Sequence, residues 1–87
     1  MNFRLTGHVR QELQNRAISL QMLVDVLEHP QQIVPEKEGR KAYQSILDFG
    51  AGRLYLLRVI VQDTTDPSVV VTAYRTRKMK KTWQERP

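Results

Sequence analysis

The sequence contains no cysteine, so it can form no disulfide framework and use no thiolate chemistry. The fold must therefore be held by packing, either alone or together with a partner. No apolar run approaches the roughly 20 residues that a membrane-spanning helix needs. The opening segment, residues 1–5, also lacks the apolar stretch of a secretory signal. These absences predict a soluble protein of the reducing cytoplasm with no membrane partner.

The sequence also lacks the usual signatures of metal and phosphate-loop chemistry. The two histidines, His8 and His29, have no carboxylate at the spacing of a zinc site. The loop Gly50-Ala51-Gly52 precedes a strand pattern rather than a helix, which predicts a hairpin turn and not a phosphate loop. No serine lies in the context of a nucleophile elbow. We therefore expect neither a metal nor an organic cofactor.

Acidic residues are few relative to basic ones, and the formal net charge of the 87 residues is +5. The length predicts one domain over residues 1–87, and a hydrophobic share of 40% suits a globular core. The positive charge is concentrated near the C-terminus, on Arg75, Arg77, Lys78, Lys80, Lys81 and Arg86. A basic tail over residues 77–87 indicates a polyanionic partner, although a solvated tail that aids solubility has the same composition.

The spacing of apolar residues predicts two helices in the first third of the chain. The first covers about residues 7–16 and follows Thr6, whose hydroxyl can accept a bond from a first-turn amide. The second follows Ser19 and ends before Pro30, which cannot continue a helix. The apolar positions recur at helical steps: Val9, Leu13, Ala17, Leu20, Leu23, Val24 and Leu27. The tight joint at Ala17-Ile18 predicts a helical hairpin.

The remainder of the chain is rich in strand patterns. Extended segments are expected at residues 31–34, 41–49, 53–62 and 68–76, with turns between them. Residues 3–6 are either a further short strand or a lead-in. Short links predict an antiparallel meander. The expected class is α+β, with an N-terminal helical hairpin packed on one face of a three- to four-stranded antiparallel sheet.

Alternation along the last two strands assigns the two faces of this sheet. The helix-facing set is Tyr55, Leu57, Val59, Val61, Val69, Val71 and Ala73. The opposite, outer set is Leu54, Leu56, Arg58, Ile60, Val70, Thr72, Tyr74 and Thr76. An arginine in an apolar strand is costly unless it reaches water or an anion, so the uncovered outer face is a candidate partner surface. Alternatively, the tail or a homodimer mate covers this face, and Arg58 pairs with an acid such as Asp48.

The remaining candidates for chemistry are basic and aromatic, which are the residue types of metal-independent RNA cleavage. His8 could act as base or acid, or be an ordinary surface histidine. Arginines would hold phosphate through bidentate contacts, and tyrosines could stack bases. The set comprises His8, Arg16, Lys41, Tyr43, Arg58, Tyr74, Arg75, Arg77 and Lys78.

The chain contains, in this order, the segments Thr6-Gly7-His8, Arg16-Ala17-Ile18-Ser19, Val26-Leu27 with Pro30, Leu57-Arg58-Val59, and Val71-Thr72-Ala73-Tyr74-Arg75-Thr76. Together they resemble the domain-of-unknown-function 4258 family. The resemblance covers about residues 3 to 80. Two positions depart from the family pattern: Glu12 stands where an arginine is frequent, and Ala17 stands where glycine is usual.

The resemblance implies similarity to the RelE/ParE toxin superfamily, whose ribonuclease members cut RNA, often on the ribosome, and are neutralised by a cognate antitoxin. It implies an mRNA endoribonuclease in which His8 transfers protons, Arg58 and Arg75 hold phosphate, and Tyr74 transfers a proton or stacks. The expected RNA contacts are Arg16, Lys41, Tyr43, Thr72, Arg77, Lys78, Lys80 and Lys81. Arg16 could instead buttress the helix joint by pairing with Glu12. The alternatives are a non-catalytic module that binds RNA or protein, and a toxin that inhibits gyrase or replication.

Overall fold

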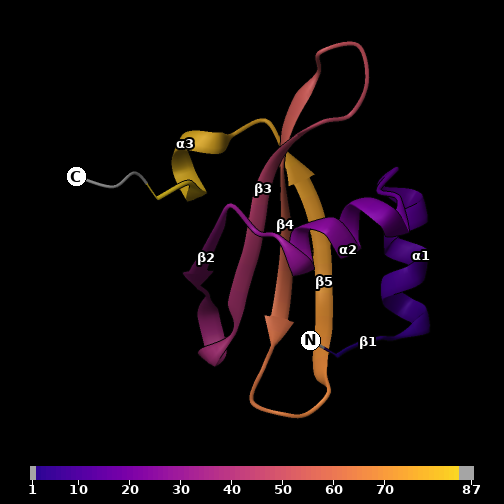
Figure 1. The fold of residues 1–87 in the computed structure, drawn as a ribbon, viewed down its shortest axis with the longest axis vertical. Coiled ribbons are helices and arrows are strands. Elements are labelled where there is room, and N and C mark those ends of the chain that lie inside the picture. The colour runs from indigo at the N-terminus through magenta and orange to yellow at the C-terminus, as the bar shows by residue number, and fades with distance from the viewer. Residues whose placement is uncertain (1, 85–87) are drawn as a thin grey trace.

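The computed structural model describes residues 2–84, apart from the side chain of Lys81, so the predicted basic residue Arg86 lies outside the described residues. The fold is α+β, with a mixed sheet of five strands in the order β1-β5-β4-β3-β2 (Figure 1). The elements in chain order are β1 (Phe3–Leu5), α1 (Gly7–Asn15), α2 (Leu20–Glu28), β2 (Gln32–Pro35), the 3-10 turn η1 (Lys37–Gly39), β3 (Lys41–Asp48), β4 (Leu54–Gln62), β5 (Ser68–Thr76) and α3 (Met79–Thr82).

Helices α1 and α2 begin where their capping residues predict. The Thr6 hydroxyl accepts a hydrogen bond from the amide of Val9 at 3.2 Å, and the Ser19 hydroxyl accepts one from the amide of Met22 at 3.1 Å. Each cap satisfies one of the amides that a helix leaves unpaired at its start. The predicted end of α2 before Pro30 is also confirmed.

The joint between these helices is a Schellman motif. The amide of Ile18 donates to the carbonyl of Leu13 at 2.9 Å, and the amide of Ala17 donates to the carbonyl of Gln14 at 3.2 Å. Ala17 has φ 54, in the left-handed region that favours glycine. Ile18 and Leu13 are both buried in the core beneath the joint, so the predicted tight turn is present.

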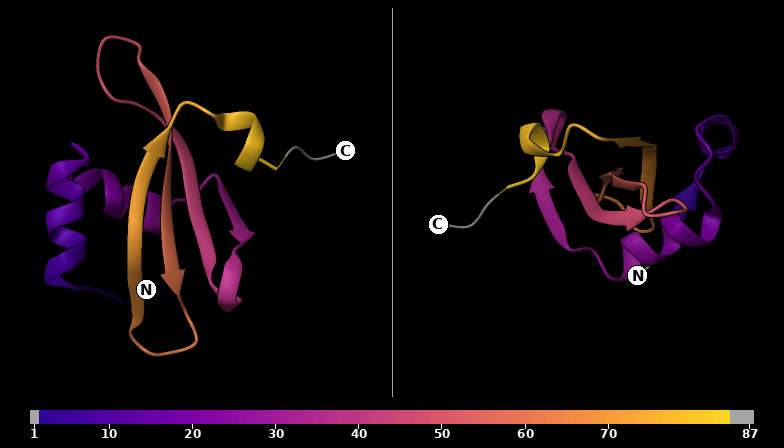
Figure 2. Two further views of the ribbon diagram at one scale, coloured as in Figure 1. Left: turned by 180° about the vertical axis from the view of Figure 1, so that it is seen from behind. Right: turned by 90° about the horizontal axis from the view of Figure 1, so that it is seen from above.

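The predicted helical hairpin is only partly right. Helix α1 packs along β5, whereas α2 lies across β3 and β4 (Figure 2). The left-handed turn at Ala17 redirects the chain, so each helix buries its own apolar stripe against the sheet and not against the other helix. Val9 and Leu13 do so from α1, and Leu23 and Val26 from α2.

The sheet is larger than predicted because residues 3–5 form a strand. β1 pairs in parallel with β5, with Phe3 opposite Ser68 and Leu5 opposite Val70. The predicted antiparallel meander is present as β2-β3-β4-β5. The sheet is therefore mixed and five-stranded rather than wholly antiparallel.

A β-bulge in β5 alters the predicted faces of that strand. Val61 lies opposite Val70, but Ile60 lies opposite Thr72, so Val71 is an extra residue on β5. Val70 consequently belongs to the core beneath the helices, and Val71 packs on the other face. The predicted assignment is wrong for these two valines and for Val69, which lies between Gln62 and Arg4 on the face opposite Val70.

The outer face is not the open apolar surface that alternation predicted. Leu56 has no exposed surface and Ile60 has 8%, and Ile60 packs with Val34 and Ala42 in a second cluster. The segment around α3 lies on this side of the sheet (Figure 2). The alternative in which the C-terminal segment covers the outer face is the one observed, because the Thr82 carbonyl accepts a hydrogen bond from the buried Gln44 side chain.

Candidate nucleic-acid interface

Arg58 is buried at the centre of a polar group on the outer face, with 4% of its side chain exposed. Its Nε donates to Gln44 Oε1 at 2.8 Å, one terminal nitrogen donates to the Tyr74 hydroxyl at 2.5 Å, and the other to Glu36 Oε1 at 2.7 Å. Burial alone would lower the pKa of Arg58, but the hydrogen bonds that Arg58 donates to Glu36 and Tyr74 raise this pKa above its ordinary value.

This geometry corrects two expectations for Arg58. Its charge partner is Glu36 and not Asp48, because the register of β3 and β4 places Asp48 opposite Leu54, at the hairpin end. Its nitrogens are already bonded to protein groups, and so is the hydroxyl of Tyr74. Arg58 therefore serves the fold here, whereas the Tyr74 hydroxyl accepts one bond from Arg58 and keeps its own O–H as a donor.

A second polar group joins α1 to β5. Arg16 pairs with Glu12 at 3.1 Å and donates to the carbonyl of Ala73 at 2.7 Å and to the Thr72 hydroxyl at 3.2 Å. The Thr72 hydroxyl in turn donates to Glu12 at 3.0 Å. The alternative in which Arg16 buttresses the helix joint is therefore observed. Thr72 lies opposite Ile60, as alternation predicted for the outer face, and its hydroxyl is also part of this polar group.

The structure does not bring His8 into the Arg58 group. His8 is 79% exposed on the first turn of α1, and its Nε2 lies 3.7 Å from Glu12 Oε1. The neighbours of Arg58 come instead from Glu36 and from strands β3 and β5. The four predicted catalytic residues are thus spread over separate sites.

Lys41 and Tyr43 also have local partners. The Lys41 ammonium lies 2.7 Å from a carboxylate oxygen of Asp63, and the hydrogen bond between them raises the pKa of Lys41. Tyr43 is 5% exposed and packs edge-on against Phe3, with ring centroids 6.2 Å apart. Tyr43 was predicted as an RNA contact, and the fold places its ring in the core.

Arginine and aromatic side chains gather at the end of the sheet that carries the β3-β4 hairpin. The Arg75 guanidinium lies 4.6 Å from the ring centroids of both Phe49 and Tyr55, and the Arg77 guanidinium lies 4.9 Å from that of Tyr55. The two rings meet edge to face, with centroids 5.4 Å apart. We call Phe49, Tyr55, Arg75 and Arg77 the arginine–aromatic ladder.

Local structure positions the ladder. The amide of Phe49 donates to the carbonyl of Arg53 at 2.9 Å, which closes the hairpin and fixes Phe49 beside Tyr55. Arg75 comes from β5, whose pairing with β4 places it opposite Leu57, two residues along from Tyr55. Alternation had assigned Tyr55 to the core beneath the helices. It remains half-buried, and its ring carries the ladder arginines instead.

The ladder arginines have no charge partner among residues 2–84. The nearby Asp48 carboxylate accepts a hydrogen bond from the Gly50 amide at 2.7 Å. A guanidinium held beside a ring keeps its N–H donors available, and their fork matches the oxygens of a phosphate. Of all the predicted phosphate ligands, Arg75 and Arg77 are the pair that the fold brings together with this geometry.

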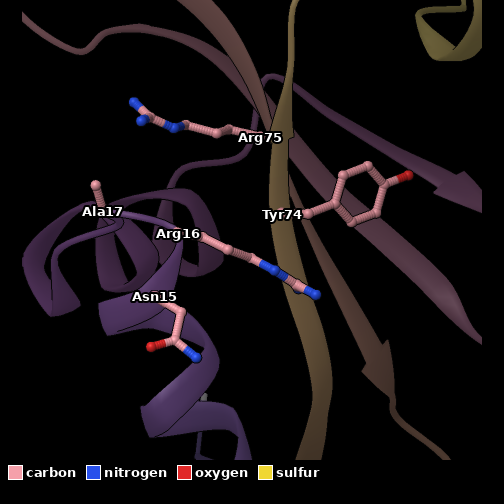
Figure 3. A pocket seen from close by; sticks show the side chains of 5 residues that line it. All are labelled: Asn15, Arg16, Ala17, Tyr74 and Arg75. Carbon is pink, nitrogen blue, oxygen red and sulfur yellow. The ribbon is translucent and has the colours of Figure 1, made fainter.

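A pocket of about 400 Å³ adjoins the ladder and is lined by Asn15, Arg16, Ala17, Tyr74 and Arg75 (Figure 3). In Figure 3 the side chains of Tyr74 and Arg75 leave β5 on opposite sides, and Arg16 reaches across the strand. The volume lies within the range of small-ligand sites. Sequence reasoning identified the three charged or aromatic lining residues but not Asn15 or Ala17.

Within residues 2–84, no three His, Asp or Glu side chains come together as metal ligands would. None of the helices in this part of the chain has the length and hydrophobicity that a bilayer crossing requires.

Comparison with known proteins gives one match. The family model described as "Domain of unknown function (DUF4258)" matches residues 5–75, which is more than half of the chain. No curated protein and no solved structure matches. The matched segment includes Arg75 and ends before Arg77 and α3.

Proposed function

The chain belongs to the DUF4258 family, and we propose that it binds single-stranded RNA, with the arginine–aromatic ladder as its phosphate-binding site. The observation that carries this proposal is that the Arg75 and Arg77 guanidiniums lie within 4.9 Å of the centroids of two half-buried rings and make no ion pair inside residues 2–84. Two fixed guanidiniums can each offer paired donors to a phosphate oxygen. The net charge of +5 favours the approach of such a polyanion.

Single-stranded RNA suits this surface better than a duplex. Sequence-tolerant binding of single strands combines a basic groove with aromatic rings on which bases stack. Phe49 and Tyr55 are half-buried, so each ring retains some accessible surface beside the arginines. The pocket next to Arg75 has the volume to admit one nucleotide that leaves the stack.

A second candidate function is a metal-independent mRNA endoribonuclease of the toxin kind, similar to the RelE/ParE superfamily. It is favoured by the pocket, where Arg16 and Arg75 lie beside Tyr74. In such a reaction the 2′-oxygen attacks phosphorus, the 5′-oxygen leaves, and the products carry a cyclic phosphate and a 5′-hydroxyl. Arg75 would stabilise the charge of the transition state, and His8 is the candidate for proton transfer. A cognate antitoxin would then cover the same basic surface.

The binding proposal is tested by fluorescence anisotropy with a short labelled oligouridine. Arg75→Ala/Arg77→Ala should weaken binding about tenfold or more, on the order of 1–3 kcal/mol, and should flatten the dependence of log affinity on log salt by about 1.4. Arg4→Ala/Arg10→Ala is the matched control, because it removes two exposed arginines from β1 and α1. Equal losses from the two double variants would show that only net charge matters and would reject the ladder as the site.

The endoribonuclease proposal needs a separate assay. The same RNA is incubated with the protein in EDTA, and the products are resolved on a denaturing gel. Cleavage that His8→Ala abolishes while binding persists would support the enzyme. Binding without cleavage would leave an RNA-binding module. Growth arrest on expression without RNA cleavage would point instead to a protein target such as gyrase.

A further inference from the structure

The chain beyond β5 forms an ordered arm, Lys78–Gln84, that docks on the outer face of the sheet (Figure 1). The Lys78 amide donates to the Thr76 hydroxyl at 3.0 Å, which ties the arm to the end of β5. Met79, Thr82 and Trp83 are half-buried, whereas Lys78 and Lys80 are exposed. The arm therefore turns its apolar side chains toward the sheet and these two lysines toward solvent.

The end of the arm is held by the side-chain amide of Gln32 on the edge strand β2. Its Oε1 accepts from the amide of Gln84 at 3.1 Å, and its Nε2 donates to the carbonyl of Gln84. One side chain thus satisfies both backbone groups of Gln84, as a neighbouring strand would. Gln44 adds to this attachment, because its Nε2 donates to Gln32 Oε1 at 2.8 Å and to the Thr82 carbonyl at 3.2 Å.

Arg58 sets the orientation of the Gln44 amide. The fully buried Gln44 accepts the Arg58 Nε–H at its oxygen, so its NH2 group must point toward Gln32 and Thr82. If the Gln44 side-chain amide were flipped, its NH2 group would face the Arg58 Nε–H, donor against donor. The Thr82 carbonyl would then lose the Gln44 donor. Glu36, which pairs with Arg58, anchors the other end of this hydrogen-bonded chain.

We infer that Arg58 is a positioning residue that acts through Gln44 and Gln32 to hold the arm, and that the arm extends the arginine–aromatic ladder along the RNA backbone. Arg77 of the ladder is followed directly by Lys78, and the arm passes from the end of β5 that carries the ladder, on the helix side of the sheet, to the outer face (Figure 2). A long RNA would therefore pass around this end of the sheet. The ligand of the arm is the sugar–phosphate backbone beyond the nucleotides bound at the ladder. This inference rests on the proposed RNA binding. The arm itself lies outside residues 5–75, the segment that the family model matches.

Trp83, the one tryptophan of the sequence, reports docking of the arm without any RNA. Gln32→Ala should shift its emission to longer wavelength and speed tryptic cleavage at Lys78 and Lys80, while the cooperative melting of the core is retained. Gln31→Ala is the matched control. The Gln31 side-chain amide also makes two hydrogen bonds to backbone groups, but those groups belong to Ile46 of β3 and not to the arm. Unchanged Trp83 emission in Gln32→Ala would overturn the role of Gln32 in holding the arm.

The part played by Arg58 is tested with Arg58→Met/Glu36→Gln, which removes the buried pair without leaving a lone charge. The expected result is the same shift of Trp83 emission as in Gln32→Ala. Unshifted emission in this folded double variant would overturn the positioning role. Should this variant fail to fold, Gln44→Glu provides the second measurement, because a carboxylate still accepts from Arg58 but cannot donate to Thr82. It too should shift the emission, and unchanged emission would overturn the same claim.

RNA binding is then compared for a short and a long oligouridine. Lys78→Ala/Lys80→Ala and Gln32→Ala should each weaken binding of the long RNA about three- to tenfold, with little effect on the short one. Equal affinities of these variants and the wild type for the long RNA would overturn the arm as an RNA surface, even where Trp83 shows it undocked. Absence of RNA binding by the wild type would reject the proposed function and, with it, this ligand. The Trp83 measurements would still decide separately whether Arg58 and Gln32 position the arm.

Discussion

Arg58 and Arg75 lie on adjacent strands, and the sequence predicts the same task for both, yet the fold uses them differently. Arg58 has 4% of its side chain exposed, and its three nitrogens donate hydrogen bonds to Gln44, Tyr74 and Glu36. Arg75 is half-buried, has its guanidinium 4.6 Å from the ring centroids of both Phe49 and Tyr55, and has no ion pair within residues 2–84. The groups that an arginine already contacts, and not its strand or its neighbours in sequence, decide whether it can bind a phosphate.

The largest expected effect is a loss of stability when the buried Arg58 is removed. Arg58→Ala should lower the free energy of unfolding by about 3–5 kcal/mol, because it leaves the Glu36 carboxylate and the Gln44 amide without their partner. Urea denaturation monitored by circular dichroism measures the loss. Arg58→Met/Glu36→Gln should lose less, since no lone charge remains. An Arg58→Ala protein that is as stable as the wild type but unable to bind RNA would reverse the roles assigned to the two arginines.

A smaller effect, on RNA affinity, is expected when the half-buried Arg75 is changed. Arg75→Lys keeps the charge but loses the planar fork and much of the stacking on Phe49 and Tyr55. It should weaken RNA binding about fivefold, on the order of 1 kcal/mol, while the free energy of unfolding falls by about 0.5–1 kcal/mol at most. Anisotropy titration and urea denaturation of the same preparation measure both. Full retention of affinity would show that charge alone suffices and that stacking is irrelevant.

The helix joint offers a change that should affect stability without affecting binding. Ala17 has φ 54, a conformation that disfavours side chains with a Cβ, so Ala17→Gly should raise the free energy of unfolding by about 1 kcal/mol. Ala17 lines the pocket beside Arg75, and the substitution removes only a methyl group. RNA affinity should therefore stay constant. A destabilised Ala17→Gly variant, measured by thermal melting, would contradict the account of the joint.

The smallest effect concerns Lys41, a basic residue that is exposed but already paired with Asp63. Its hydrogen bond with Asp63 raises the pKa of Lys41 above the ordinary 10.5. The pair should stabilise the fold below pH 10.5, and this contribution should disappear as the pH rises through the higher folded-state pKa. The difference in melting temperature between wild type and Lys41→Met should therefore shrink above that pH. A difference that is constant from neutral to alkaline pH would contradict the assignment.

Local chemistry made much of the fold predictable. Thr6 and Ser19 have side chains that cap helices, and Pro30 and Gly50-Ala51-Gly52 interrupt regular structure, so two helices and the long hairpin could be placed. The bulge at Val71 could not, because an extra residue in a valine-rich run leaves no mark on the sequence. β1 was uncertain because a three-residue strand depends on its parallel partner β5 for stability.

The candidate site was less predictable than the fold. Alternation placed Arg58 on the correct face but could not show that Glu36 and Gln44 would meet it there. Tyr55 was assigned to the core, because alternation shows the face of a residue but not how far the helices extend over it. The partners of Arg58 and the helix cover near Tyr55 depend on residues far apart in the sequence, whereas caps and turns depend on neighbouring residues.

The central claim is that RNA meets the ladder and leaves the Arg58 group untouched. Titration of the isotope-labelled protein with a short oligouridine, followed by NMR, tests it most directly. The account predicts chemical-shift changes at Phe49, Tyr55, Arg75 and Arg77, with the side-chain Nε–H of Arg58 unmoved. Changes centred on Arg58, with the ladder unaffected, would contradict the account and would make the buried group the binding site.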